Sequence, residues 1–342
     1  MELTKKTIKT SKTVVLIVSF LTMSFNCNSR QPSDWNSRTW SSAINLTGKM
    51  SKKGVTELSG LHWNPVSNRL YAVQDNGRLR ILQLNKPAGT FEQIADLSSI
   101  GCPEGIMQVD YNANEFYTID EESYEIRKYT LSADLSSAVL ANKWSVLAPP
   151  SPMVNTGNDG PEGIEFVPDK YLRSAGFISS ETNEKYTSTK GMGGLIFIAH
   201  QKKGYIWVFD VNPNKNDDFI FVGKYKTNRN ESCDLGFDRS TGLLYILHNT
   251  GENTLEVTDL SSELVSGKRK LLTKKEYNIP NPTENINVEG FAITPKFADS
   301  TNVNVWLCRD VDHKEDSSLR HDCLRWFTHF QALGTNIKDW QK

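Results

Sequence analysis

The sequence predicts an all-β protein, a five-bladed β-propeller closed by an N-terminal strand. The main observation is an internal repeat, in which five segments share a strand start, a turn, an aromatic-rich strand and a third strand. The strand starts recur roughly every 45 to 71 residues, a spacing typical of four-stranded propeller blades. No helical periodicity of comparable length interrupts the repeat. A six-bladed propeller is the alternative.

In each repeat unit the first strand starts at an equivalent position, and an apolar run typical of a second strand follows. In the first unit, the second strand is predicted at residues 70–73, and in the fourth unit at residues 243–247. Both runs are apolar, with β-branched or aromatic residues, as expected for a strand buried on both faces. Turn residues precede them, including Asn64-Pro65 and the segment 238–242. The equivalent starts are Ser59, Glu104, Glu162, Cys233 and Glu289.

Two segments complete the predicted domain. The fifth unit ends after three strands, and residues 39–47, which precede the first unit, can supply its outer strand. Such closure removes the exposed edges that favour aggregation. The third unit contains an insert at residues 169–193, rich in Ser, Thr, Lys and Gly, which we expect to be a mobile surface loop.

The N-terminus reads as an export signal. Four lysines within the first twelve residues precede an apolar run at 14–25, which is shorter than the about 20 residues of a membrane-spanning helix. The following Met-Ser-Phe-Asn-Cys resembles a lipobox, although Asn before Cys27 departs from the usual Gly, Ala or Ser. We therefore predict a lipoprotein signal peptide at 1–27 with lipidation at Cys27, a flexible tether at 28–42 and a single propeller domain at 43–342. An ordinary signal peptide cut near Cys27 is the alternative.

The amino-acid composition and the predicted export signal together indicate which partners and which cellular location to expect for the protein. Hydrophobic residues make up 38% and charged residues 23% of the chain, which is typical of a globular domain. The net charge is -1, so nucleic acid is not expected as a partner. We expect a monomer in the bacterial cell envelope, facing the periplasm or on the outer membrane, with membrane contact only through the lipid anchor.

Cysteine pairing stays open at this stage. Apart from Cys27 the chain has four cysteines, which permit two disulfides in three pairings: Cys102, Cys233, Cys308 and Cys323. Their spacing fits no zinc motif. Cys308 and Cys323 lie on neighbouring predicted strands and are the best candidates for a disulfide. Buried free thiols are the alternative.

The repeat also resembles a known family. Residues 57–65 (Glu-Leu-Ser-Gly-Leu-His-Trp-Asn-Pro) and 70–76 resemble the opening of the SdiA-regulated propeller proteins, and the Glu-Gly pairs at 104, 162 and 289 are similar to that family's strand starts. The fourth unit departs from the pattern with Cys233-Asp234. A looser likeness extends to the esterase-like domain named after phytase and to gluconolactonase-type propellers. The resemblance implies an exported propeller with calcium binding as an expectation and no settled activity.

Propeller topology predicts where acidic side chains gather. The first strand of each blade lines the central channel and pairs antiparallel with the second, so the start of the first and the end of the second share one face. Glu104, Glu162 and Glu289 are therefore expected on one rim, together with Asp75 and Asp120, which Glu121 follows. At roughly 8 Å and an effective dielectric of 20, each pair of charges costs about 2 kcal/mol. We predict that these carboxylates bind a hard cation, with Ca²⁺ the best candidate. The alternative is that the glutamates accept hydrogen bonds from backbone amides of neighbouring blades.

Candidates for catalysis are weaker. His200 and His248 end equivalent strands, and with Asp310 and a metal they could activate water, or they could simply be rim residues. Arg309 could bind an anion at the same mouth. No nucleophile elbow, Walker loop, dinucleotide fingerprint or HExxH motif is present. The favoured function is a module that binds a small ligand or an envelope protein and has a calcium site. The alternative is a metal-dependent hydrolase of phosphate esters, esters or lactones.

Overall fold

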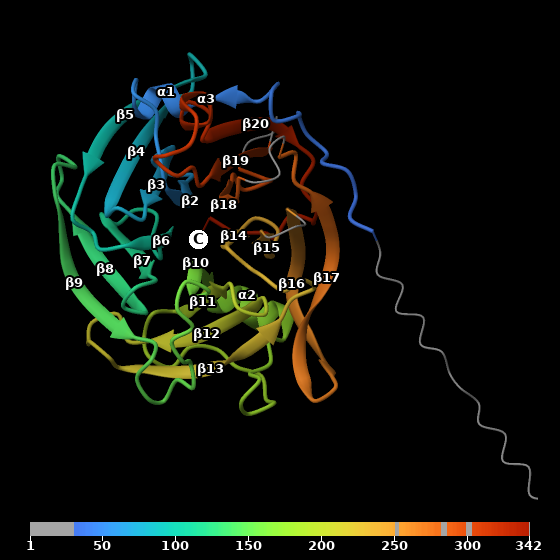
Figure 1. Ribbon diagram of the computed structural model, residues 1–342. Coiled ribbons are helices and arrows are strands. Elements are labelled where there is room, and N and C mark those ends of the chain that lie inside the picture. The colour runs from blue at the N-terminus through green and yellow to red at the C-terminus, as the bar shows by residue number, and fades with distance from the viewer. Residues whose placement is uncertain (1–30, 250–252, 282–285, 299–302, 342) are drawn as a thin grey trace, which may run out of the picture. The chain divides into compact units, whose positions relative to one another are not determined.

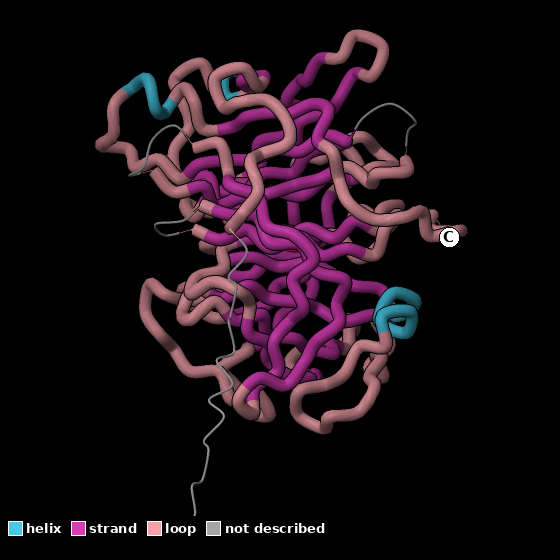
Figure 2. Tube along the Cα trace, turned by 90° about the vertical axis from the view of Figure 1, so that its right-hand side faces the viewer, coloured by secondary structure: helices cyan, strands magenta, loops and turns pink. Residues whose placement is uncertain are grey.

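Strands form nearly all the regular structure of this protein. The computed structural model describes residues 31–249, 253–281, 286–298 and 303–341. Within them, the helices are α1 (Thr47–Met50), α2 (Asp169–Ala175) and α3 (Ser317–Arg320). Figure 2 shows how small their share is beside the strands. The predicted all-β class is confirmed. None of the described helices has the length and apolar character needed to cross a membrane.

The strands form antiparallel groups of four, which follow one another along the chain. The first group contains β2 (Leu58–Asn64), β3 (Arg69–Gln74), β4 (Arg78–Asn85) and β5 (Thr90–Leu97). The second contains β6 (Pro103–Met107), β7 (Glu115–Asp120), β8 (Glu125–Leu131) and β9 (Ala138–Ser145). The third contains β10 (Pro161–Pro168), β11 (Gly194–His200), β12 (Tyr205–Val211) and β13 (Phe219–Lys226).

The fourth and fifth groups differ from the others in how they are completed. The fourth contains β14 (Asp234–Asp238), β15 (Leu243–His248), β16 (Thr254–Val265) and β17 (Lys268–Asn278). A parallel bridge between Lys226 and Lys270 joins it to the third group as one eight-stranded sheet. The fifth contains β18 (Val288–Ile293), β19 (Val303–Arg309) and β20 (Leu324–Phe330). Its fourth strand is β1 (Ile44–Asn45), which pairs with β20, so the N-terminal segment completes this group as expected.

The first strand of every group faces a common centre. Strands β2, β6, β10, β14 and β18 each pack against the next, and β18 packs against β2 again. Figure 1 shows these strands around the centre and the later strands of each group farther out. The sheets therefore form a propeller-like ring, in which equivalent positions of the inner strands lie at the same level.

Aromatic side chains fill the seams between neighbouring groups. Trp63 of the first group stacks on Trp306 of the fifth, with ring centroids 4.6 Å apart. Tyr245 of the fourth group stacks on Phe291 of the fifth at 5.7 Å. Because large buried rings contribute strongly to hydrophobic stability, these contacts hold adjacent sheets together.

The chain before β1 is bound to the domain, in contrast to the flexible tether expected at 28–42. We call residues 32–46 the N-terminal strap. Ser33 forms a parallel bridge with Tyr277 near the C-terminal end of β17. Trp35 packs against Phe327 and Phe330, with ring centroids 5.6 and 4.9 Å away. The strap therefore covers the edge of the fourth group before it completes the fifth. Cys27 and residues 28–30 lie outside the described residues.

The insert in the third group is also packed against the domain, in contrast to the mobile loop we expected. Its residues Tyr171, Leu172 and Phe177 are buried in a core cluster between the third and fourth groups. Asp210 on β12 fixes the far end of the insert, because its carboxylate accepts hydrogen bonds from the Tyr186 hydroxyl and other donors of that segment. The apolar residues within a polar segment explain why it is ordered.

The cysteines of the described residues are free thiols, so the proposed Cys308–Cys323 disulfide is wrong. The register explains this result, because Cys308 is opposite Leu324 rather than Cys323. The Cys308 thiol lies 3.6 Å from the Leu58 carbonyl oxygen, whereas the Cys323 thiol donates to the Val55 carbonyl at 3.0 Å.

Candidate functional site

Three glutamates from different strand groups converge at one end of the central channel. Glu104 is on β6, Glu162 on β10 and Glu289 on β18, and all three are buried. Burial raises the pKa of Glu104 and Glu162 well above the usual value, and the negative charge of Glu289 adds to both shifts. This mutual influence is consistent with the packing of the inner strands around the ring, which brings equivalent positions of β6, β10 and β18 near one another.

Two aspartates that follow second strands complete the group. Asp75 comes directly after β3 and accepts a hydrogen bond of 2.7 Å from the Ser59 hydroxyl. Asp310 comes directly after β19, and burial followed by the charges of Asp75 and Glu57 raises its pKa to about 7. We call Asp75, Glu104, Glu162, Glu289 and Asp310 the acidic mouth.

Neutral amides surround part of the acidic mouth. The side-chain nitrogen of Asn287 lies 3.3 Å from Oε1 of Glu289, and that of Asn249 lies 3.5 Å from the same oxygen. The largest electrostatic influences on Glu162 come from acidic groups: Glu104, Glu289, Glu121 and Asp75. Within the described residues, Oδ1 of Asp310 is buried without a hydrogen-bond partner. The mouth therefore concentrates carboxyl groups whose ionised forms are destabilised by burial and by one another.

Other carboxylates link the inner strands to one another. Asp234 replaces the expected glycine in the fourth group and accepts a 2.7 Å hydrogen bond from the backbone amide of Phe291 on β18. Glu165 on β10 accepts one of 3.1 Å from the amide of Phe237 on β14. In the described part of the chain, Glu104 and Glu289 form hydrogen bonds with side chains, and no hydrogen bond joins Glu104, Glu162 or Glu289 to a backbone amide of a neighbouring group. The alternative in which these glutamates lock the blades thus lacks support.

Asp120, which we expected among the metal ligands, has different partners. Its carboxylate forms an ion pair with Arg127 and accepts a 2.8 Å hydrogen bond from the Cys102 amide. The next residue, Glu121, instead raises the pKa of Glu104 and Glu162. Successive side chains of a strand point to opposite sides, so a shift by one residue exchanges which carboxylate faces the mouth.

Neither candidate histidine shares a contact with the acidic mouth in the described residues. His200 accepts a 3.1 Å hydrogen bond from the Lys202 amide and packs on Trp207. Burial and the charge of Lys202 lower its pKa to about 4, so it is neutral at physiological pH. His248 is fully buried between the Glu231 carbonyl oxygen, 2.6 Å from Nδ1, and the Glu256 carboxylate, 3.0 Å from Nε2.

The surroundings of His248 resemble a Ser-His-Glu triad, but they do not form a nucleophile. The Ser232 hydroxyl lies 3.2 Å from Nδ1, and a general base would need a lone pair on that nitrogen. Nδ1 instead faces the Glu231 carbonyl oxygen and must carry a hydrogen as the donor. Ser232, His248 and Glu256 are all completely buried. Burial alone would raise the pKa of Glu256. Hydrogen bonds with His248 and Thr273 instead hold this pKa below its usual value. The network stabilises the fourth group.

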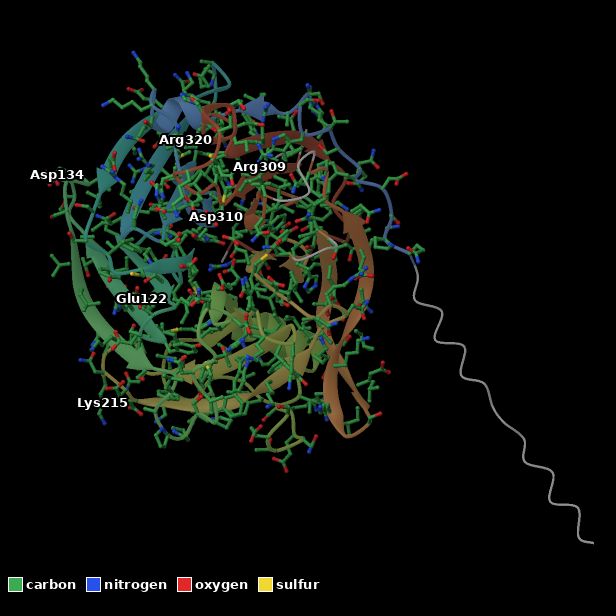
Figure 3. All side chains as sticks on the ribbon, in the orientation of Figure 1. Glu122, Asp134, Lys215, Arg309, Asp310 and Arg320 are labelled. Carbon is green, nitrogen blue, oxygen red and sulfur yellow. The ribbon has the colours of Figure 1, made fainter. Side chains whose placement is uncertain are left out.

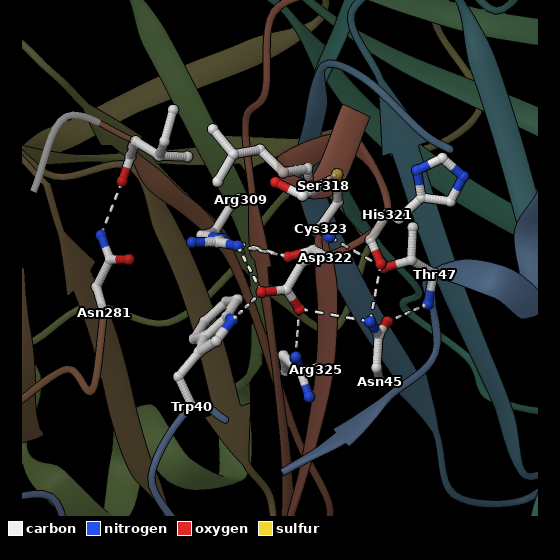
Figure 4. A network of polar contacts seen from close by, with 12 residues as sticks. Trp40, Asn45, Thr47, Asn281, Arg309, Ser318, His321, Asp322, Cys323 and Arg325 are labelled. Carbon is white, nitrogen blue, oxygen red and sulfur yellow. Dashed lines mark hydrogen bonds and ion pairs between the residues drawn. The ribbon is translucent and has the colours of Figure 1, made fainter. Parts of the chain in front are cut away.

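Arg309 contacts the strap. Nη2 of its guanidinium donates to the Asp322 carboxylate and to the Asp322 carbonyl, both at 2.8 Å. The Trp40 ring lies 4.5 Å from the guanidinium carbon (Figure 4). Arg309 and Asp310, labelled in Figure 3, are adjacent in sequence, yet only Asp310 belongs to the acidic mouth. The expected role of Arg309 as an anion-binding group at the mouth lacks support.

The acidic mouth offers suitable ligands for calcium but not a preformed coordination shell. Among the described residues, no three His, Cys, Asp or Glu side chains converge closely enough to hold one metal ion directly. Calcium accepts six to eight oxygen ligands, including waters, in flexible geometry. The oxygen atoms that the mouth offers to such an ion are those of the Glu104, Glu162 and Glu289 carboxyl groups and of the Asn249 and Asn287 side-chain amides.

A separate cleft of about 310 Å³ lies between the second group and loops of the third. Glu115 and Lys128 line one wall and form an ion pair of 3.0 Å, while Met192 and Pro213 line the other. None of the predicted site residues contributes to this cleft. It is therefore distinct from the acidic mouth.

Part of the chain matches the model of a known protein family, and solved structures resemble the chain at low sequence identity. Residues 37–172 match the model of the SdiA-regulated family, so the predicted resemblance is confirmed over this part of the chain. No functionally curated protein matches the chain. Among solved structures, the crystal structure of Myxococcus xanthus glutaminyl cyclase is similar, with a TM-score of 0.46 and 9% sequence identity over 80% of this chain and 89% of that chain.

Proposed function

We propose that this protein is a five-bladed β-propeller module that binds Ca²⁺ at the acidic mouth and presents that face to a small ligand or an envelope protein. The observation that carries the proposal is the convergence of Glu104, Glu162 and Glu289 from three strand groups, with Asp75 and Asp310 beside them. Each group of four strands would form one blade, with β1 as the outer strand of the fifth.

The electrostatics of the mouth provide the physical reason for a cation. Buried like charges must be neutralised by protons, by basic neighbours or by a bound ion. The groups that act on Glu104 and Glu162 supply further negative charge. A divalent ion would neutralise two of the carboxylates and leave open positions, through which an anionic or hydroxyl group of a ligand could bind.

Hydrolysis is a weaker proposal than binding. The hydrolase alternative assigns water activation to His200 or His248, and His248 is completely buried beside Glu256. Lewis-acid chemistry by a bound ion remains compatible with the mouth, but the described contacts give neither histidine a position from which to act on a ligand there.

Calcium is expected to stabilise the protein against heat. An ion that binds only the native state at 100 times its Kd adds about 2.7 kcal/mol of stability. The measurement is the unfolding midpoint with calcium and with a chelator, for the wild type and for Glu162→Gln. Glu92→Gln is the matched control, because Glu92 is exposed on the outer strand β5. An identical midpoint in calcium and chelator for the wild type would remove the cation site from the proposal.

We also propose that the protein is a lipoprotein of the bacterial cell envelope, anchored through Cys27 and facing the periplasm or on the outer membrane. The support is the basic and apolar N-terminal pattern, which ends at Cys27. Cys27→Ser is expected to move the protein from the membrane fraction to the soluble fraction, as measured by detergent partitioning and immunoblotting. A variant that still partitions with membranes would contradict lipid anchoring at this residue.

A further inference from the structure

We propose that the N-terminal strap positions the acidic mouth, with Trp40 and Arg309 as the positioning residues that fix Asp310. This inference rests on the proposed cation site and extends it. It connects the segment that follows the expected anchor with the affinity of the site for its ion.

The first step is the contact between the strap and the fifth strand group. The indole nitrogen of Trp40 donates a 3.0 Å hydrogen bond to Oδ2 of Asp322, and the same ring lies over the Arg309 guanidinium. Arg325 donates to the other oxygen of Asp322 at 2.5 Å and to the Ala43 carbonyl of the strap at 2.7 Å. Figure 4 shows Asp322 at the centre of this network.

The second step is the position of Arg309 between the strap and the mouth. Its side chain is completely buried, and its charge is balanced by Asp322. A buried guanidinium that loses its carboxylate or its aromatic cover must either recruit water or move, because an uncompensated buried charge is costly. Displacement of Trp40 would therefore move Arg309 and, through the shared backbone, Asp310.

The third step leads from Asp310 to the other ligands. The Asp310 amide donates a 3.1 Å hydrogen bond to the Asn287 carbonyl, and the Asn287 side chain donates to Glu289. The charge of Asp310 is also the largest electrostatic contribution to the raised pKa of Glu289. Oδ1 of Asp310 is buried and lacks a partner among the described residues, so it is free to bind an ion. Two of the five carboxylates of the mouth thus depend on the backbone that Arg309 fixes.

A consequence is that the strap can regulate the site. A strap that is docked keeps Asp310 and Glu289 in place, and a strap pulled away from β20 and β17 loosens both. Tension on the segment before Pro32 would reach Trp40 once the contacts of Ser33 and Trp35 with the domain are broken. The fold thereby couples the state of the N-terminal segment to cation affinity.

The test compares two tryptophans of the strap. Trp40→Leu removes the cover of Arg309, while Trp35→Leu removes packing on Phe327 and Phe330 and leaves Arg309 untouched. We expect Trp40→Leu to weaken calcium binding by about three- to tenfold in titration calorimetry, whereas Trp35→Leu lowers the unfolding midpoint without changing the calcium Kd. Trp40→Phe keeps an aromatic ring over Arg309 and should restore most of the affinity.

The outcomes separate this inference from the cation site itself. If Trp40→Leu does not fold, Asp322→Asn tests the same link, since it weakens the ion pair with Arg309 but preserves the shape of the side chain. An unchanged calcium Kd in the Trp40 and Asp322 variants, or an equal loss in Trp35→Leu, would overturn the positioning role alone. A wild type that binds no calcium would overturn the cation site and the positioning role with it.

Discussion

Replacement of Gly163 by alanine is expected to destabilise the protein by about 3 kcal/mol, at the upper end of the usual cost of overpacking. A Cβ atom on Gly163 would lie 2.5 Å from the Cα atom of Asp234 and 2.9 Å from the Cys233 carbonyl oxygen. Both atoms belong to the backbone at the start of the adjacent inner strand β14, and neither can rotate away as a side chain could. The inner strands would have to separate, which would disturb their packing around the ring.

Chemical denaturation at equilibrium measures this effect. Gly48→Ala is the matched control, because a Cβ atom there would meet nothing within 4 Å. Gly48 lies in helix α1, where alanine is the more favourable residue, so the control should be neutral or slightly stabilising. A Gly163→Ala protein with wild-type stability would contradict the close packing of β10 on β14.

The same geometry explains why glycine follows the glutamate in several repeats. A Cβ atom on Gly105 would lie 2.7 Å from the Ile164 amide nitrogen, and one on Gly60 would lie 2.6 Å from the Glu104 carbonyl oxygen. Each glycine therefore permits close approach to the next inner strand, while the residue before it faces the channel. In the fourth group Asp234 replaces this glycine and links the strands through its carboxylate.

Local sequence patterns were sufficient to predict the strands, the order of the groups and the convergence of Glu104, Glu162 and Glu289. These features follow from the alternation of side chains and from antiparallel pairing, which act over a few residues. The partners of Arg309 were not predictable in this way. Trp40 is far from Arg309 in sequence, and the pairing of β1 with β20 helps to bring the two segments together.

Two segments pack against the domain although their average composition is polar, because each contains individual large apolar residues. Residues 28–42 are polar overall, but Trp35 and Trp40 pack against aromatic residues and Arg309. The insert at 169–193 is rich in polar residues, but Tyr171 and Phe177 enter the core. Large aromatic residues in a polar segment are the signal that could have predicted docking, since their burial offsets the entropy of ordering the chain.

Without calcium, the stability of the protein is expected to fall as the pH rises from about 6.5 to about 8. An acid whose pKa is raised in the folded state binds more protons there than in the unfolded chain, so folding becomes less favourable as the pH rises through the folded pKa. Asp310 and Glu165, each with a pKa of about 7, and the three mouth glutamates, with pKa values well above normal, all act in this direction.

The buried histidines oppose this trend mainly below about pH 6.5. Burial lowers the pKa of His62 to about 3 and that of His200 to about 4. Their unfolded forms take up protons below about pH 6.5, so they make stability rise with pH in that lower range. Above about pH 6.5 the unfolded histidines lose their remaining protons, so their opposing effect fades, and the more numerous raised carboxyl groups determine the slope. Denaturation curves at several pH values, with chelator present, provide the measurement.

Calcium is expected to reverse this pH dependence, because the ion competes with protons for the same carboxylates and binds more tightly as they ionise. Its stabilising effect should therefore grow from about pH 6.5 to about pH 8 and be lost in Glu162→Gln. Glu165→Gln is the sharper control, since Glu165 has a raised pKa but bonds to the amides of Phe166 and Phe237 and is not part of the acidic mouth. That variant should reduce the slope without calcium and retain the response to calcium. An equal loss of the calcium response in both variants would mean that the ion does not act at the mouth.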